Sequence, residues 1–294
     1  MEEKDIIKEA NLGLKLCEEG KLDEGITHLR IAAHNNYLEA IVNLGHALEL
    51  KGEYDEAYKW TNIGATLKEP IALSNLSLMY RKGRGTLCDV SKAVKCGEEL
   101  IKMNYIDEGY NSIVCAYLYA NDSSQQDFKK GYEYALKGSE EIMKESPQKG
   151  KKCDTIIQLA LCYDFGKGIT ENKSEALKYY KYGMACGNSF CYYNAGCILS
   201  YSNDEKIFDI NTGINYLQIS GDLGFADGYF EIGFLFHEGK QIEKDLNIAQ
   251  YYYSLAIRMG NGERYYQDAV NNLLEISREN AERMISGKYC ITID

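Results

Sequence analysis

Proline and tryptophan are scarce in this 294-residue chain, which has two prolines and one tryptophan. Because proline breaks helix interiors, its scarcity leaves the backbone almost continuously available for helical hydrogen bonds. Helices still have to end, and the 27 glycines fall at recurring offsets between apolar segments, where they can act as stop signals. The composition therefore predicts an all-α protein built from short helices.

Positive charge is also in short supply, with 33 Lys and Arg against 44 Asp and Glu and a formal net charge of −11. A chain with this balance repels a phosphate backbone. The densest basic run, over 149–152, is an isolated loop patch. We therefore expect no nucleic-acid partner.

Long apolar runs are missing too. No stretch approaches the ~18 apolar residues that a membrane span needs. The acidic start at 1–5 lacks the apolar core of a signal peptide, so we expect a cytoplasmic protein with no membrane span. Its ten cysteines form no CxxC pair and no Cys/His zinc pattern. They are expected to be free thiols, and we expect neither a metal site nor a cofactor.

What the sequence does contain is an internal repeat. The segment Ala10-Asn11-Leu12-Gly13 recurs at 42–45 and 74–77, each time after 32 positions, and later copies follow at 157–160, 193–196 and 230–233, with a degenerate copy at 111–114. A fixed period of this size indicates a helical repeat array. We expect the array over 1–264 and a capping helix with a tail over 265–294, the helix itself near 263–286. The predicted repeats lie near 10–39, 40–71, 72–108, 109–152, 153–190, 191–227 and 228–264.

Each repeat is predicted to be a pair of helices. In the second repeat, apolar residues recur with helical spacing over 40–50 and 54–67, and Gly52 is placed to end the first helix. The third and fifth repeats carry a wider loop with paired glycines, at 83 and 85 and at 166 and 168. Asp89 and Asn172 then stand where N-caps of the second helices are expected.

The best single copy, over 159–187, resembles the Sel-one-like repeat, a member of the tetratricopeptide-like superfamily. Its matching residues are Tyr163, Gly166, Gly168, Ala176, Tyr179, Tyr180 and Gly187. The resemblance covers about 255 residues and is weakest in the fourth repeat, which carries a polar insert at 121–127. It implies a right-handed superhelical solenoid of about seven helix-turn-helix repeats, in which the first helices line a concave wall.

The resemblance also places a column of polar residues on that wall, two positions before the small residue of each repeat. The column consists of Asn11, Asn43, Asn75, Gln158, Asn194 and Glu231. Because an amide both donates and accepts, such a column could pair with the backbone of an extended peptide. The alternative is that these side chains bond neighbouring helices and stabilise the stack.

Neighbouring positions add further candidates for contact with a protein or peptide. They are His46, Arg81, Asp164, Tyr193, Phe230 and Phe234. Exposed aromatic side chains would serve as binding anchors. The same aromatic residues could instead fill the core or the contacts between repeats.

No catalytic residue is predicted. The four histidines lie in separate segments without an HExxH pattern, and the paired glycines neither follow a strand nor precede Lys-Ser/Thr as a phosphate loop would. The favoured function is a non-catalytic scaffold or adaptor that binds a protein or peptide in its groove. One alternative is a small-peptide sensor or regulatory subunit that changes shape on ligand binding, and another is a hydrolase without recognisable motifs.

Overall fold

The computed structural model describes residues 1–260 and 265–289. In that part of the chain there are fifteen α-helices and one short 3-10 helix, and no strand. The predicted all-α fold is confirmed. The chain divides into two compact units: the N-terminal unit is Met1–Ser146 with Lys152–Glu171, and the C-terminal unit is Pro147–Lys151 with Asn172–Asp294.

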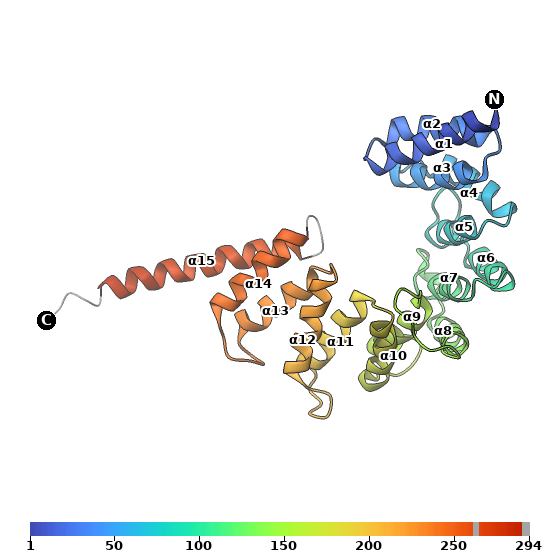
Figure 1. Ribbon diagram of the computed structural model, residues 1–294. Helices are drawn as coiled ribbons and strands as arrows, with labels where there is room; N and C mark the ends of the chain where they lie inside the picture. Colours follow the sequence, from blue (N-terminus) through green and yellow to red (C-terminus); the bar gives the residue numbers. More distant parts are fainter. Residues whose placement is uncertain (261–264, 290–294) are drawn as a thin grey trace. The chain divides into compact units, whose positions relative to one another are not determined.

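The N-terminal unit contains nine α-helices that follow one another in chain order, from blue to green in Figure 1. They are α1 (Glu3–Glu18), α2 (Leu22–His34), α3 (Leu38–Lys51), α4 (Tyr54–Thr66), α5 (Pro70–Lys82), α6 (Val90–Lys102), α7 (Ile106–Leu118), α8 (Phe128–Ile142) and α9 (Asp154–Phe165). Each helix contacts the next, and α1, α3, α5, α7 and α9 also contact one another in sequence. These first helices of the repeats, here called A helices, thus form a continuous row, and the second helices are called B helices.

The C-terminal unit has the same alternation. Its helices are α10 (Lys173–Ala185), α11 (Ser189–Tyr201), α12 (Ile210–Asp222), α13 (Asp227–Glu238), α14 (Leu246–Met259) and α15 (Tyr266–Tyr289). Here too each helix contacts the next, and the A helices α11 and α13 contact each other. The long α15, red in Figure 1, packs on α14. The predicted closing helix corresponds to α15, although its expected start at residue 263 lies outside the described residues.

Small residues let each A helix approach its own B helix. A Cβ atom added to Gly45 would lie 2.6 Å from the hydroxyl oxygen of Thr61, and one added to Gly233 would lie 2.8 Å from the ring of Tyr253. Either contact is shorter than two packed atoms allow. The small side chain of the repeat is therefore required by the packing of its two helices.

Helix ends follow the expected signals. Asp89 accepts a hydrogen bond from the backbone N–H of Lys92 at 2.9 Å, and Asn172 accepts one from Glu175 at 3.1 Å. Gly52 ends α3 in the left-handed conformation with φ of 85°. These three predictions are confirmed, and each reflects a backbone group that the helix itself cannot satisfy.

The paired glycines have a second role beyond their positive φ. Gly85 and Gly168 have φ of 65° and 77°, and a Cβ atom on either would collide with a backbone carbonyl of the preceding repeat. That carbonyl belongs to Tyr54, the first residue of α4, for Gly85, and to Phe128, the first residue of α8, for Gly168. The wider loops therefore contact the B helix before them, which fixes how successive repeats fit together.

The cysteines contribute to the packing as thiols. Nine cysteines among the described residues are free, and five of these are buried. Burial raises the pKa of the Cys96 thiol to about 11 and that of the Cys162 thiol to about 12. A buried thiol with a raised pKa is unreactive and acts as a small apolar group.

Candidate functional site

Three of the predicted amide positions lie side by side on the A helices of the N-terminal unit. Asn11 on α1 is exposed, whereas Asn43 on α3 and Asn75 on α5 are half-buried. Within the described residues, none of the three side-chain amides forms a hydrogen bond. Because each amide offers two donors and an acceptor, this row has free hydrogen-bonding capacity for another molecule.

The fourth amide of the row is already engaged. The Tyr119 hydroxyl, at the C-terminal end of α7, donates to Gln158 Oε1 on α9 at 2.9 Å. Burial raises the pKa of Tyr119 to about 12, and the nearby Arg81 guanidinium opposes that rise. Gln158 therefore ties α9 to α7 as the stack-stabilising alternative expects.

Two cations flank Tyr119. Arg81, from the last turn of α5, donates to the main-chain carbonyl of Tyr119 at 3.3 Å, and the ammonium of Lys167 lies 4.7 Å from the centre of its ring. Beside them, burial raises the pKa of the Cys115 thiol. Arg81 and Lys82 act against that rise and Asp154 adds to it.

Two further candidates of the N-terminal unit differ in accessibility. His46 is exposed on α3, five residues before the end of that helix. Asp164, in the last turn of α9, is only 4% exposed. His46 can therefore meet a partner, whereas Asp164 cannot do so in this conformation.

In the C-terminal unit the equivalent positions hold the unit together. Glu231 on α13 accepts hydrogen bonds from the hydroxyls of Tyr193 and Tyr201 on α11, at 3.2 and 3.0 Å. Burial, reinforced by neighbouring groups that include the Glu231 carboxylate, raises the pKa of both tyrosines far above the usual range. Asn194 is 8% exposed and donates to the carbonyl of Phe190 in its own helix at 2.7 Å.

The aromatic wall predicted at the C-terminal end is not open. Phe230 is 7% exposed, and its ring stacks on that of Tyr265 at 4.6 Å with an interplanar angle of 4°. The ring of Phe234 also stacks on that of Phe230, with 6.3 Å between their centres. Tyr265 directly precedes α15, so the capping helix brings the ring that covers Phe230. The exposure expected for Phe230 is corrected accordingly: Phe230 belongs to the core, and the half-buried Phe234 and Tyr265 pack against it.

Three residues of these clusters were not among the predicted ones, namely Tyr119, Lys167 and Tyr265. Nothing in the helical periodicity distinguishes Tyr119 or Tyr265. Lys167 could have been found, because it stands between the paired glycines of its loop just as Arg84 does between those of the third repeat.

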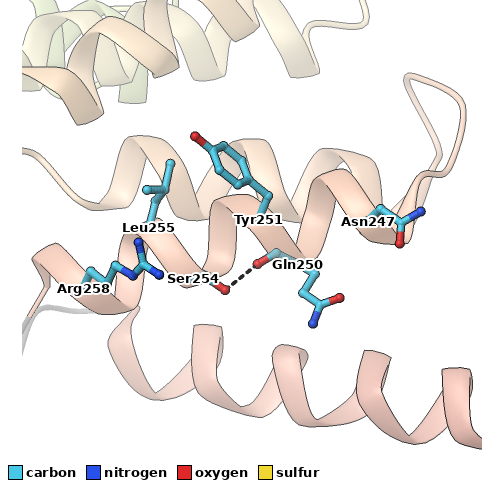
Figure 2. A pocket seen from close by; sticks show the side chains of 6 residues that line it. All are labelled: Asn247, Gln250, Tyr251, Ser254, Leu255 and Arg258. Atoms are coloured by element: carbon cyan, nitrogen blue, oxygen red, sulfur yellow. Dashed lines mark hydrogen bonds between the residues drawn. The ribbon is translucent and has the colours of Figure 1, made fainter.

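A surface depression of about 310 Å³ lies along α14. Figure 2 shows its six lining side chains, Asn247, Gln250, Tyr251, Ser254, Leu255 and Arg258, spread along one helix. The hydroxyl of Ser254 donates to the carbonyl of Gln250 at 2.7 Å, within the helix. These groups do not converge on one point, so the depression has no catalytic arrangement.

Two other kinds of site, a membrane span and a metal centre, are not found among the described residues. None of their helices is both long enough and apolar enough to cross a membrane. Within the same ranges, no three His, Cys, Asp or Glu side chains are grouped as ligands of a metal ion.

Comparison with known families identifies the repeat. The model of the Sel1 repeat matches four segments, 70–105, 114–141, 155–188 and 226–261. They fall on the third, fourth, fifth and seventh predicted repeats, so the fourth repeat is matched despite its insert. No curated protein matches the chain.

Several solved structures match the chain, and the first of those named here is similar in fold. A Sel1 repeat protein from Oxalobacter formigenes is 20% identical with a TM-score of 0.57, covering 85% of this chain and 99% of its own. A protective antigen of uropathogenic Escherichia coli with an SLR fold is 20% identical, with a TM-score of 0.37 and coverage of 95% and 69%. An immunity protein from Pseudomonas aeruginosa is 16% identical, with a TM-score of 0.43 and coverage of 70% and 74%.

Proposed function

We propose that this chain, four segments of which match the Sel1 repeat, is a non-catalytic scaffold that binds a protein or peptide along the A helices of its N-terminal unit. Sel1 repeat proteins commonly mediate protein–protein interaction. The partner segment would lie extended across α1, α3 and α5. Such binding uses main-chain hydrogen bonds, which give affinity without requiring one particular sequence.

The observation that supports this proposal is the free row of amides at Asn11, Asn43 and Asn75. Each stands at the same place in its repeat, and neighbouring A helices contact each other. A polar group that is half-buried without a hydrogen bond is less stable than a bonded one. A peptide backbone that pairs with these amides would satisfy them.

Charge and composition support the remaining parts of the proposal. The net charge of −11 disfavours nucleic acid as the partner. We propose that the binding takes place in the cytoplasm and without a cofactor.

The experiment compares capture by three forms of the full chain. The wild type, the Asn11→Ala/Asn43→Ala/Asn75→Ala variant and a control, Asn211→Ala/Asn215→Ala, are immobilised and exposed to an extract of the native host. Both control positions are exposed on α12, outside the A helices. Captured proteins are identified by mass spectrometry, and one is then titrated by calorimetry.

We expect the wild type and the control to retain the same partner and the triple variant to bind it at least about tenfold more weakly, since each lost hydrogen bond weakens binding by about 0.5–1.5 kcal/mol. Circular dichroism checks that the variants are folded. Equal affinity of all three folded forms would contradict binding along this row.

A further inference from the structure

In the described part of the chain, cations that lie over tyrosine rings commonly also contact a carboxylate. In four such contacts the same cation is also within 3.5 Å of a carboxylate of the chain. These are Arg84 over Tyr54 with Glu49, Lys92 over Tyr80 with Asp89, Lys130 over Tyr117 with Asp127, and Lys178 over Tyr179 with Glu175. Lys167 over Tyr119 differs from these four, because it forms no ion pair with any described residue.

The contrast is sharpest between Arg84 and Lys167, which occupy the same place in their loops. Each stands between paired glycines and reaches back toward the preceding A helix. Arg84 meets the carboxylate of Glu49 on α3 at 2.7 Å. At the equivalent contact, Lys167 meets the ring of Tyr119, next to α7. The second repeat therefore supplies an acid to Arg84, whereas Lys167 forms no such ion pair with the described residues of the fourth repeat.

Arg81 adds a second cation beside Tyr119, and it has further N–H groups that can donate hydrogen bonds. One of its N–H groups donates to the carbonyl of Tyr119, and a guanidinium has five N–H donors in all. Within the described residues neither Arg81 nor its neighbour Lys82 forms an ion pair. Both side chains are half-buried, as is Lys167. Half-buried cations that lack a carboxylate favour the binding of an anion.

We propose that Arg81 and Lys167, which both contact Tyr119, bind the carboxylates of an acidic peptide segment. This inference rests on the proposed function and specifies its partner: the segment that crosses the amide row carries Asp, Glu or a free C-terminal carboxylate where it reaches α7. The opposite charges of cluster and ligand supply the selectivity, since a neutral segment leaves both cations unpaired.

The test uses synthetic peptides and the full chain. Three fluorescein-labelled hexapeptides are compared by fluorescence anisotropy: alternating Gly-Glu with a blocked C-terminus, alternating Gly-Gln with a blocked C-terminus, and alternating Gly-Gln with a free C-terminus. The first and third distinguish side-chain carboxylates from a terminal one. The chain is used as wild type, as Arg81→Gln/Lys167→Gln, and as the control Lys92→Gln/Lys178→Gln, whose cations already have carboxylate partners.

We expect a carboxylate-bearing peptide to bind the wild type and the control at least about tenfold more tightly than the blocked Gly-Gln peptide, because charge-assisted hydrogen bonds are about twice as strong as neutral ones. The Arg81→Gln/Lys167→Gln variant should bind all three peptides equally. Equal binding of the three peptides by the wild type would overturn the proposal, as would an unchanged preference in this variant.

Failure of the acidic-site proposal can be distinguished from failure of the proposed binding along the amide row. If the Arg81→Gln/Lys167→Gln variant binds the captured partner as tightly as the wild type while the amide variant does not, the groove is retained and the acidic specificity is rejected. If the amide variant binds that partner normally but the peptide preference depends on Arg81 and Lys167, the acidic site exists without the proposed row.

Discussion

The same repeat position behaves differently in the two units. In the N-terminal unit, Asn43 and Asn75 are half-buried and form no hydrogen bond within the described residues. In the C-terminal unit, Asn194 donates to its own helix and Glu231 accepts from two tyrosines. The first three A helices of the N-terminal unit thus carry free polar groups at this position, whereas in the C-terminal unit both groups are engaged, and Glu231 joins two A helices.

The surroundings of each position explain the difference. Around Glu231 and Phe230 the neighbouring A helix supplies tyrosines, and Tyr265 before α15 covers the aromatic face. The A helices α1, α3 and α5 carry no tyrosine that reaches Asn43 or Asn75 with a hydrogen bond. A repeat position is therefore available for binding only where the next helices leave it uncovered.

The largest effect on stability is expected from removing the ring of Phe230, which Tyr265 covers. Phe230→Ala should destabilise the C-terminal unit by about 3–5 kcal/mol, because it leaves a cavity between Tyr265, Tyr253 and Phe234. Hydrogen exchange of the α13 amides measures the loss. Leu274→Ala, at an exposed position of α15, serves as the control and should change little. A Phe230→Ala effect as small as that of the control would mean that the ring is not part of a core.

Removing the shared acceptor should have the next largest effect. Glu231→Ala leaves the hydroxyls of Tyr193 and Tyr201 without their carboxylate, at a cost of about 1.5–3 kcal/mol in free energy of unfolding. Glu231→Gln keeps an acceptor and should lose less. Chemical denaturation of both variants tests this ranking, and a Glu231→Ala variant as stable as wild type would show that the bonds do not support the unit.

In the N-terminal unit, Tyr119→Phe should cost about 1 kcal/mol at neutral pH, since it removes the hydrogen bond to Gln158. Tyr119 also makes the unit sensitive to alkali. Its pKa is raised in the folded protein, so folding favours the neutral hydroxyl. The contribution of Tyr119 to the free energy of unfolding is therefore complete below its ordinary pKa of about 10 and is lost as the pH rises toward about 12. Denaturation at rising pH, compared between wild type and Tyr119→Phe, measures this. A wild type that loses no more stability than the variant would contradict it.

The smallest effect is expected at the free amides. Asn43→Ala and Asn75→Ala should each change the free energy of unfolding by less than about 0.5 kcal/mol, because neither breaks a bond within the described residues. Asn194→Ala should cost about 1 kcal/mol, since its amide donates to Phe190. Thermal unfolding of the three single variants checks the order. A loss at Asn43 equal to that at Asn194 would remove the contrast between the units.

Much of the fold could be predicted because its signals are local. The recurring small residues mark where A and B helices touch, as Gly45 does against Thr61. Asp89 and Asn172 cap the helices that follow them, and Gly52 ends the helix before it. Each of these features depends on a few neighbouring residues, so the sequence pattern was sufficient.

The accessibility of the candidate site could not be predicted in the same way. The burial of Phe230 depends on Tyr265, which is 35 positions later in the chain and has no motif around it. The engagement of Gln158 depends on Tyr119 from another repeat. Contacts of this range follow from how the helices pack, and a periodic pattern does not encode them.

The collision that a side chain at Gly85 or Gly168 would cause has a consequence for how such an array can be lengthened or recombined. Since these glycines abut the carbonyls of Tyr54 and Phe128 in the preceding repeat, loop and upstream B helix must be compatible with each other. A transplanted segment that runs from the start of a B helix through the next glycine loop carries both surfaces, whereas a cut at the boundary between repeats separates them. Duplication of a segment that runs from a B helix through the next glycine loop should therefore be tolerated more readily than duplication of a segment cut at the repeat boundary.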